Sequence, residues 1–123
     1  MANKIDIRAD IVKNRLYLVL IGFFQDDEVK AASDKCIAEA SKLKPGFDVI
    51  NDISQFKPAT PKGADEIKRT QLFVKQHGVK RVIRIVGDAV ITQAQFSRQE
   101  KEAGYNADTA ATLTEAEKIL DGK

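Results

Sequence analysis

The stretch NDISQFKPATPKG, residues 51–63, decides the fold because it joins the end of one predicted strand to the start of a predicted helix. The strand is FDVIND, residues 47–52, and the helix is PKGADEIKRTQLFVKQHG, residues 61–78. A second apolar strand, KRVIRIVG, follows at 80–87. Two strands that are separated by a helix pair in parallel, so this part of the chain predicts a β-α-β unit.

Upstream of this unit, the chain predicts a hairpin and a further helix. KIDIRAD (4–10) alternates apolar and charged residues, as a strand with one solvated face does. NRLYLVLIG (14–22) follows after a short turn at Lys13 and Asn14, and both of its faces are apolar, which is typical of a central strand. DDEVKAASDKCIAEASKLKPG (26–46) has apolar residues at helical spacing.

Downstream, the pattern predicts a weaker helix at 92–103, a short strand at 108–112 and a final helix, TEAEKIL. Thr114 and Glu117 have the spacing of a capping box. The whole chain, 1–123, is therefore interpreted as one α/β domain. Its mixed sheet of four to five strands begins with an antiparallel hairpin, is parallel in the middle, and is accompanied by about four helices.

Composition excludes several classes of function. The 123 residues carry a net charge of +2, too small to indicate nucleic acid or an anionic membrane as partner. With one cysteine and one histidine, the chain cannot form a metal centre of the Cys/His type. No glycine-rich nucleotide motif occurs, so we expect no cofactor. The longest apolar run, 16–24, is about half the length of a membrane helix, and no signal peptide is recognisable, so we expect a cytoplasmic protein without a membrane span.

The order of elements, the segment VINDISQF (49–56) and the glycine Gly63 near the start of the second helix resemble the STAS domain family. The likeness is to its SpoIIAA-like branch, that of bacterial anti-sigma factor antagonists, and covers nearly the whole chain. In signalling members a serine of an Asp-Ser-Ser-Gly motif is phosphorylated, but here Thr60-Pro61-Lys62-Gly63 stands in its place. The resemblance therefore implies a regulatory, protein-binding role without the phosphoacceptor serine.

Five residues in and beside the 51–63 stretch are candidates for contact with a partner or ligand: Asp52, Ser54, Phe56, Thr60 and Lys62. Ser54 follows Asp52 at the carboxyl end of a strand, where open α/β sheets bind ligands, although a local turn is the favoured reading. Thr60 is favoured as the helix N-cap over a modified hydroxyl, and Ser54 is the other hydroxyl considered for modification. For Phe56, a place in the core is favoured over an exposed anchor.

The remaining chemically active side chains do not indicate an enzyme. His77 and Thr60 lie at opposite ends of the second helix, roughly 24 Å apart at 1.5 Å per residue, so they cannot form a catalytic dyad. Cys36 lies on the apolar stripe of the first helix and is expected to be buried. Arg84 lies within a strand, and alignment of like faces predicts a charge pair with Asp48 or Asp52.

Two functions follow as alternatives. The first is a non-enzymatic regulatory module that binds a protein partner through residues 52–63 and the first turn of the following helix. The second is a carrier or sensor of a small apolar ligand or lipid, which would need a cavity bounded by Phe23, Phe24, Phe56 and Phe73. The sequence leaves open whether the protein is a monomer or a homodimer.

Overall fold

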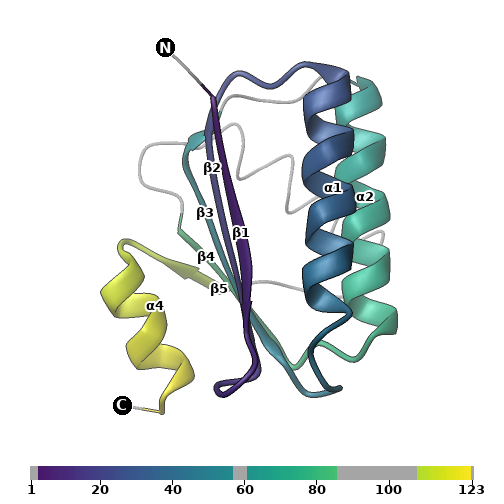
Figure 1. Ribbon diagram of the computed structural model, residues 1–123. Coiled ribbons are helices and arrows are strands. Elements are labelled where there is room, and N and C mark those ends of the chain that lie inside the picture. The colour runs from purple at the N-terminus through teal and green to yellow at the C-terminus, as the bar shows by residue number, and fades with distance from the viewer. Residues whose placement is uncertain (1–2, 57–60, 86–107, 123) are drawn as a thin grey trace.

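The computed structural model describes residues 3–56, 61–85 and 108–122 and has the expected mixed α/β architecture (Figure 1). Its elements, in chain order, are β1 (Lys4–Asp10), β2 (Arg15–Gly22), α1 (Asp26–Ala40), β3 (Asp48–Phe56), α2 (Pro61–Gln76), β4 (Arg81–Ile85), β5 (Asp108–Ala110) and α4 (Leu113–Leu120). The described residues thus contain five strands and three helices. The helix predicted at 92–103 lies outside them.

The strands form one sheet in the order β1-β2-β3-β4-β5. β1 and β2 pair antiparallel and the middle pairs β2–β3 and β3–β4 are parallel, as the sequence predicted; β4 and β5 also pair in parallel. The crossovers through α1 and α2 both advance in the same direction across the sheet. Because such crossovers are nearly always right-handed, both helices must cover the same face. Figure 1 shows α1 and α2 together on one face and α4 on the other.

The turn of the β1–β2 hairpin is fixed by Asn14, which has a φ of 54°. Asparagine tolerates this left-handed conformation better than most residues. Its side chain also accepts a hydrogen bond from the backbone N–H of Lys44 at 2.9 Å and donates one to the carbonyl of Lys44 at 3.1 Å. The hairpin is thereby tied to the segment that follows α1.

Each face of the sheet has its own core, and β2 contributes to both. Leu16, Leu18 and Leu20 pack with α1 and α2, whereas Tyr17 packs on the face that α4 covers. The α4 side has a smaller cluster of buried residues: Tyr17, Ile50, Ile83, Ile85, Ala110 and Ala116. Both faces of this strand are therefore covered, in agreement with their apolar character.

Several boundaries differ from the prediction, among them the end of α1 at Ala40, and two of the differences have a clear structural cause. β3 extends to Phe56 because Gln55 and Phe56 pair with Ile21 and Gly22 after a register shift that places one extra residue in β3, which sequence alternation does not reveal. Residues 53–56, which were expected to form the first half of the connecting loop, therefore belong to strand β3. At the last helix, Thr112 and not Thr114 is the N-cap: its hydroxyl accepts a hydrogen bond from the N–H of Glu115 at 3.1 Å.

The predicted pairing of Arg84 with Asp48 or Asp52 is wrong. Arg84 aligns with Asn51 in the β3–β4 register, which places both on the face that α1 and α2 cover. Asp48 and Asp52 project to the opposite face. A shift of one residue in register exchanges the two faces, and nothing in either strand sequence specifies the register.

A cluster of charged and polar side chains attaches α4 to the sheet. The guanidinium of Arg15, whose residue is 5% exposed, donates to Glu117 at 2.9 Å and to Asp121 at 3.0 Å. The Tyr17 hydroxyl donates to the same carboxylate of Glu117 at 2.7 Å, and Lys13 lies 3.3 Å from it. Three donors therefore converge on one carboxylate.

This convergence makes stability depend on pH through Glu117. Burial raises the pKa of Glu117, but hydrogen bonds from Tyr17, Arg15 and Lys13 outweigh that effect and hold the pKa below its usual value of 4.5. A carboxylate with a lowered pKa stabilises the folded state above its unfolded pKa, and this contribution disappears as pH falls through the folded pKa. We expect Glu117→Gln to lower the free energy of unfolding at pH 7 by about 1–2 kcal/mol and to reduce the loss of stability below about pH 4.5.

Urea unfolding between pH 3 and 7 measures both effects. Asp65→Asn, which removes an exposed carboxylate of α2, serves as the control. An acid transition of Glu117→Gln identical to that of the unsubstituted protein would contradict the assignment.

Candidate ligand-binding cavity

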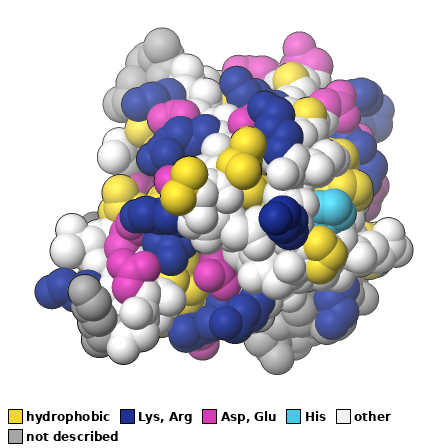
Figure 2. Space-filling view, turned by 60° about the horizontal axis from the view of Figure 1, so that its bottom comes forward, with side chains coloured by type: hydrophobic (Ala, Val, Ile, Leu, Met, Phe, Trp, Pro, Cys, Tyr) yellow, Lys and Arg dark blue, Asp and Glu magenta, His cyan; other side chains and the backbone are white. Residues whose placement is uncertain are grey.

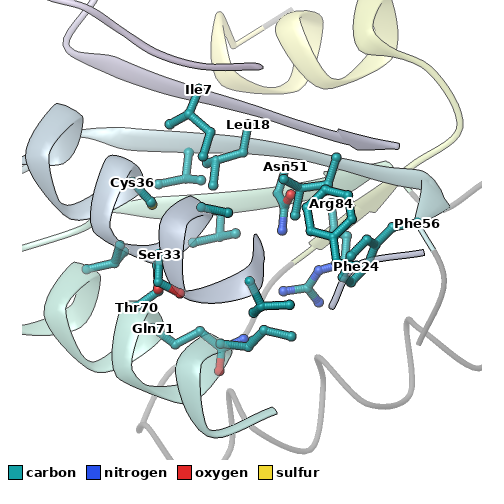
Figure 3. Close-up of a pocket in the computed structure, with 17 residues that line it drawn as sticks. Ile7, Leu18, Phe24, Ser33, Cys36, Asn51, Phe56, Thr70, Gln71 and Arg84 are labelled. Carbon is teal, nitrogen blue, oxygen red and sulfur yellow. The ribbon is translucent and has the colours of Figure 1, made fainter. Parts of the chain in front are cut away.

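A cavity of about 70 Å³ lies between the sheet and helices α1 and α2 (Figure 3). Most of its lining is apolar and comes from all four of the longer strands, from both helices and from the segment before α1. The apolar lining residues are Ile7, Leu18, Leu20, Phe24, Val29, Ala32, Cys36, Val49, Phe56, Ile67, Val74 and Val82.

The gap exists because α1 presents short side chains to the sheet. Ala32, Ser33, Cys36 and Ala40 are all buried on this helix, and three of them line the cavity. Ser33 also holds α1 against α2, since its hydroxyl donates to the carbonyl of Glu66 at 3.1 Å. The helices therefore pack on each other and leave the space above the strands partly unfilled.

The cavity also has a polar part, formed by neighbouring residues of β3 and β4. Asn51 and Arg84 align in the sheet, and only 8% and 1% of their surfaces are exposed. Figure 3 shows their polar ends on the helix side of the sheet, with Phe24 and Phe56 nearby. The Asn51 carbonyl oxygen, Oδ1, accepts no hydrogen bond from any described residue. A buried acceptor without a donor destabilises the folded state by about 1–3 kcal/mol. A hydrogen-bond donor on a bound molecule would remove this cost at Asn51 Oδ1.

The other polar groups of the lining include two hydroxyls with a common acceptor. Ser33 and Thr70 each donate to the carbonyl of Glu66 at 3.1 Å. Arg84 adds a guanidinium with five N–H donors. Asn51 and Arg84 together can therefore accept and donate hydrogen bonds at the same end of the cavity.

The size of the cavity limits what it encloses. At roughly 10–15 Å³ per water-sized group, 70 Å³ admits about five such groups. An engineered protein cavity of about 150 Å³ binds benzene, so this one encloses about half of such a ligand. A short chain fits here, but a complete lipid tail does not.

The structure separates the five residues that the sequence singled out. Asp52 and Ser54 lie within β3 and not in a connecting loop, and Asp52 Oδ1 accepts hydrogen bonds from the Ser54 N–H at 3.0 Å and hydroxyl at 2.7 Å. Phe56 is buried and stacks edge-on against Phe24 with ring centres 5.1 Å apart, which confirms its place in the core. Lys62 is exposed in the first turn of α2, and Thr60 lies outside the described residues.

The aromatic set expected around a cavity is half correct. Phe24 and Phe56 line it, but Phe23 is 51% exposed. Phe73 stacks on His77 instead, with ring centres 5.5 Å apart, and His77 Nε2 lies 2.8 Å from the carbonyl of Leu43. His77 is therefore engaged in packing at the end of α2.

Sequence reasoning missed Asn51 as a lining residue and misplaced Arg84. The available signal was an amide and a guanidinium inside otherwise apolar strands, because a buried polar residue is more informative than an exposed one. Asn51 and Arg84 lie side by side because of the register between β3 and β4, and the sequence alone did not predict that register.

Cys36 gives a direct test of how closed the cavity is. Burial raises the pKa of its thiol from 9.0 to about 12. Because only the thiolate reacts, we expect alkylation at pH 8 to be about a thousandfold slower than for an unfolded chain. The measurement is the rate of labelling with a thiol reagent, with and without denaturant. A native rate within about tenfold of the unfolded rate would contradict the burial.

On the opposite face of the sheet, a groove of about 170 Å³ runs beside the start of α4. Its lining includes Asp6, Arg8, Tyr17, Asp52 and Leu113, and Leu113 is 49% exposed. Arg8 lies over the Tyr17 ring, 4.2 Å from its centre. On the surface visible in Figure 2, basic and acidic side chains are intermixed, with hydrophobic ones scattered between them.

Among the described residues, no three metal-ligating side chains are grouped together. No helix in the same part of the chain has both the length and the apolar character needed to cross a bilayer. No protein-family model matches the chain, and no curated protein matches it.

Proposed function

We propose that this chain is a binding protein, not an enzyme, and that it holds a small, largely apolar ligand with one hydrogen-bonding group in the cavity between the sheet and helices α1 and α2. The observation that supports this most directly is the unpartnered Oδ1 of Asn51 beside Arg84, at the edge of apolar walls. Apolar pockets with a few convergent polar groups are the usual form of small-molecule sites.

The lining also supports a particular class of ligand. A hydroxyl group could donate to Asn51 Oδ1 and accept from Arg84, and a carboxylate could accept from Arg84, whereas a pure hydrocarbon would pair with neither. The enclosed volume of about 70 Å³ favours a short chain or the end of a longer one. Short-chain alcohols and carboxylic acids therefore fit the site best, in a protein that we place in the cytoplasm.

A matched pair of substitutions tests whether ligands enter the cavity. Ala32 is buried and lines the cavity, whereas Ala38 is exposed on the same helix. Ala32→Leu should fill the space, weaken hexanol binding by about tenfold or more, and leave stability unchanged or raised by up to about 1 kcal/mol. Ala38→Leu should bind hexanol as the unsubstituted protein does.

The measurement is titration of hexanol and hexanoic acid, followed by amide chemical shifts. Shift changes confined to residues around the cavity, and lost in Ala32→Leu, would support the proposal. Absence of saturable shifts with both probes, or equal binding by the two variants, would exclude it.

Asn51→Leu tests the polar part of the site. This near-isosteric change removes the unsatisfied acceptor, so the free energy of unfolding should stay the same or rise. Affinity for hexanol should fall by about tenfold, while affinity for a hydrocarbon probe such as cyclopentane should not fall. If both probes lose affinity equally, Asn51 acts only through the shape of the cavity.

A regulatory, protein-binding role is the second candidate. It is supported by the groove beside α4, where Asp52 lies near the exposed Leu113, and by the resemblance to STAS domains. In a binding assay with a candidate partner, Asp52→Ala and Leu113→Ser should each reduce retention, and Ala38→Leu should not. Retention unchanged by both groove substitutions would remove the support for this role.

A further inference from the structure

Strand β1 forms one edge of the sheet. Alternate residues of β1 direct their backbone N–H and C=O groups away from β2. Ala9 donates its N–H to Glu39 Oε1 of α1 at 3.1 Å, so this N–H points away from β2. In an antiparallel pair, alternate residues direct their backbone groups to the same side. Ile5 and Ile7 therefore also present their N–H and C=O groups at this edge, along a strand of seven residues without proline or glycine.

The charged side chains of β1 form a second regular feature. Lys4, Asp6, Arg8 and Asp10 alternate in sign and project to the face opposite α1 and α2. In β2, Ile21, Val19 and Tyr17 lie opposite the first three of them. None of the four takes part in an ion pair between described residues, although Arg8 lies over the Tyr17 ring.

The order of these charges is self-complementary when the strand is reversed. If two copies of β1 pair antiparallel about a two-fold axis at Ile7, Lys4 faces Asp10 of the second copy and Asp6 faces Arg8 of the second copy. Each of these contacts occurs twice by symmetry. Opposite charges at directly facing positions stabilise a strand pair, whereas like charges there destabilise it.

The same register also gives hydrogen-bond partners to the backbone groups of β1 that point away from β2. Ile7 faces Ile7, and Ile5 faces Ala9, so the outward-pointing residues are the ones that would exchange N–H···O bonds. The Ala9 N–H would pass from Glu39 to the carbonyl of Ile5 in the second copy. Glu39 would keep its contact with Lys42, whose ammonium lies 2.5 Å away.

We propose that β1 is a homodimerisation edge, at which two copies of this chain pair antiparallel about Ile7 and form a continuous sheet. An isologous interface needs a surface that is complementary to itself, and the charge order of Lys4–Asp10 meets this requirement. The proposal is independent of the ligand in the cavity.

Sedimentation velocity of the full chain over a range of concentrations tests the proposal. The protein should dimerise, and dimerisation should weaken with added salt because the ion pairs are exposed. Asp6→Arg and Arg8→Asp should each weaken the dimer by about tenfold or more, since each places like charges opposite one another. The double variant Asp6→Arg/Arg8→Asp restores opposite charges and should dimerise as the unsubstituted protein does.

Asp65→Arg makes the same charge change at an exposed position of α2 and should leave dimerisation unaltered. Ile5→Pro removes an outward N–H, which an edge strand tolerates, and should give a folded monomer. A monomer at every concentration would overturn the proposal. Dimerisation unaffected by the single substitutions, or a folded double variant that stays monomeric, would overturn it equally.

Discussion

The handedness of the two parallel crossovers is the constraint from which the rest of the structure follows. Because β2, β3 and β4 succeed one another in the same direction, α1 and α2 must both lie on one face of the sheet. That face acquires a two-helix cover and the larger core, and the cavity forms where this cover is thin. The other face is left to α4, a helix of eight residues.

So short a helix is marginal by itself, since isolated helices need about 12–15 residues even with favourable sequences. The attachment of α4 therefore depends on Arg15 and Tyr17, which reach Glu117 from the neighbouring strand β2. The two faces of the sheet are thus held differently. The larger core of one face consists of apolar packing, whereas the attachment of α4 to the other face also uses the Glu117 carboxylate, whose contribution is lost when it is protonated.

Helix α1 takes part in both the proposed cavity and the proposed dimerisation edge. Its small residues, among them Ala32 and Cys36, leave the cavity unfilled, and its Glu39 binds the backbone of the edge strand at Ala9. A protein selected only for stability would fill such a space and satisfy the Asn51 acceptor, because each defect costs about 1–3 kcal/mol. Retaining both features is consistent with a site that is stabilised when it is occupied.

The sequence by itself determined the elements: alternation located β1, a run that is apolar on both faces located β2, helical spacing located α1, and Asn14 allowed the hairpin turn. It also determined that Cys36 and Phe56 are buried, since hydrophobic patterning reports burial directly. Only the tertiary structure decided which face Arg84 occupies and that it lies beside Asn51. A strand sequence specifies that its side chains alternate, but the register with the neighbouring strand decides which side chains meet, and that register depends on contacts between distant parts of the chain.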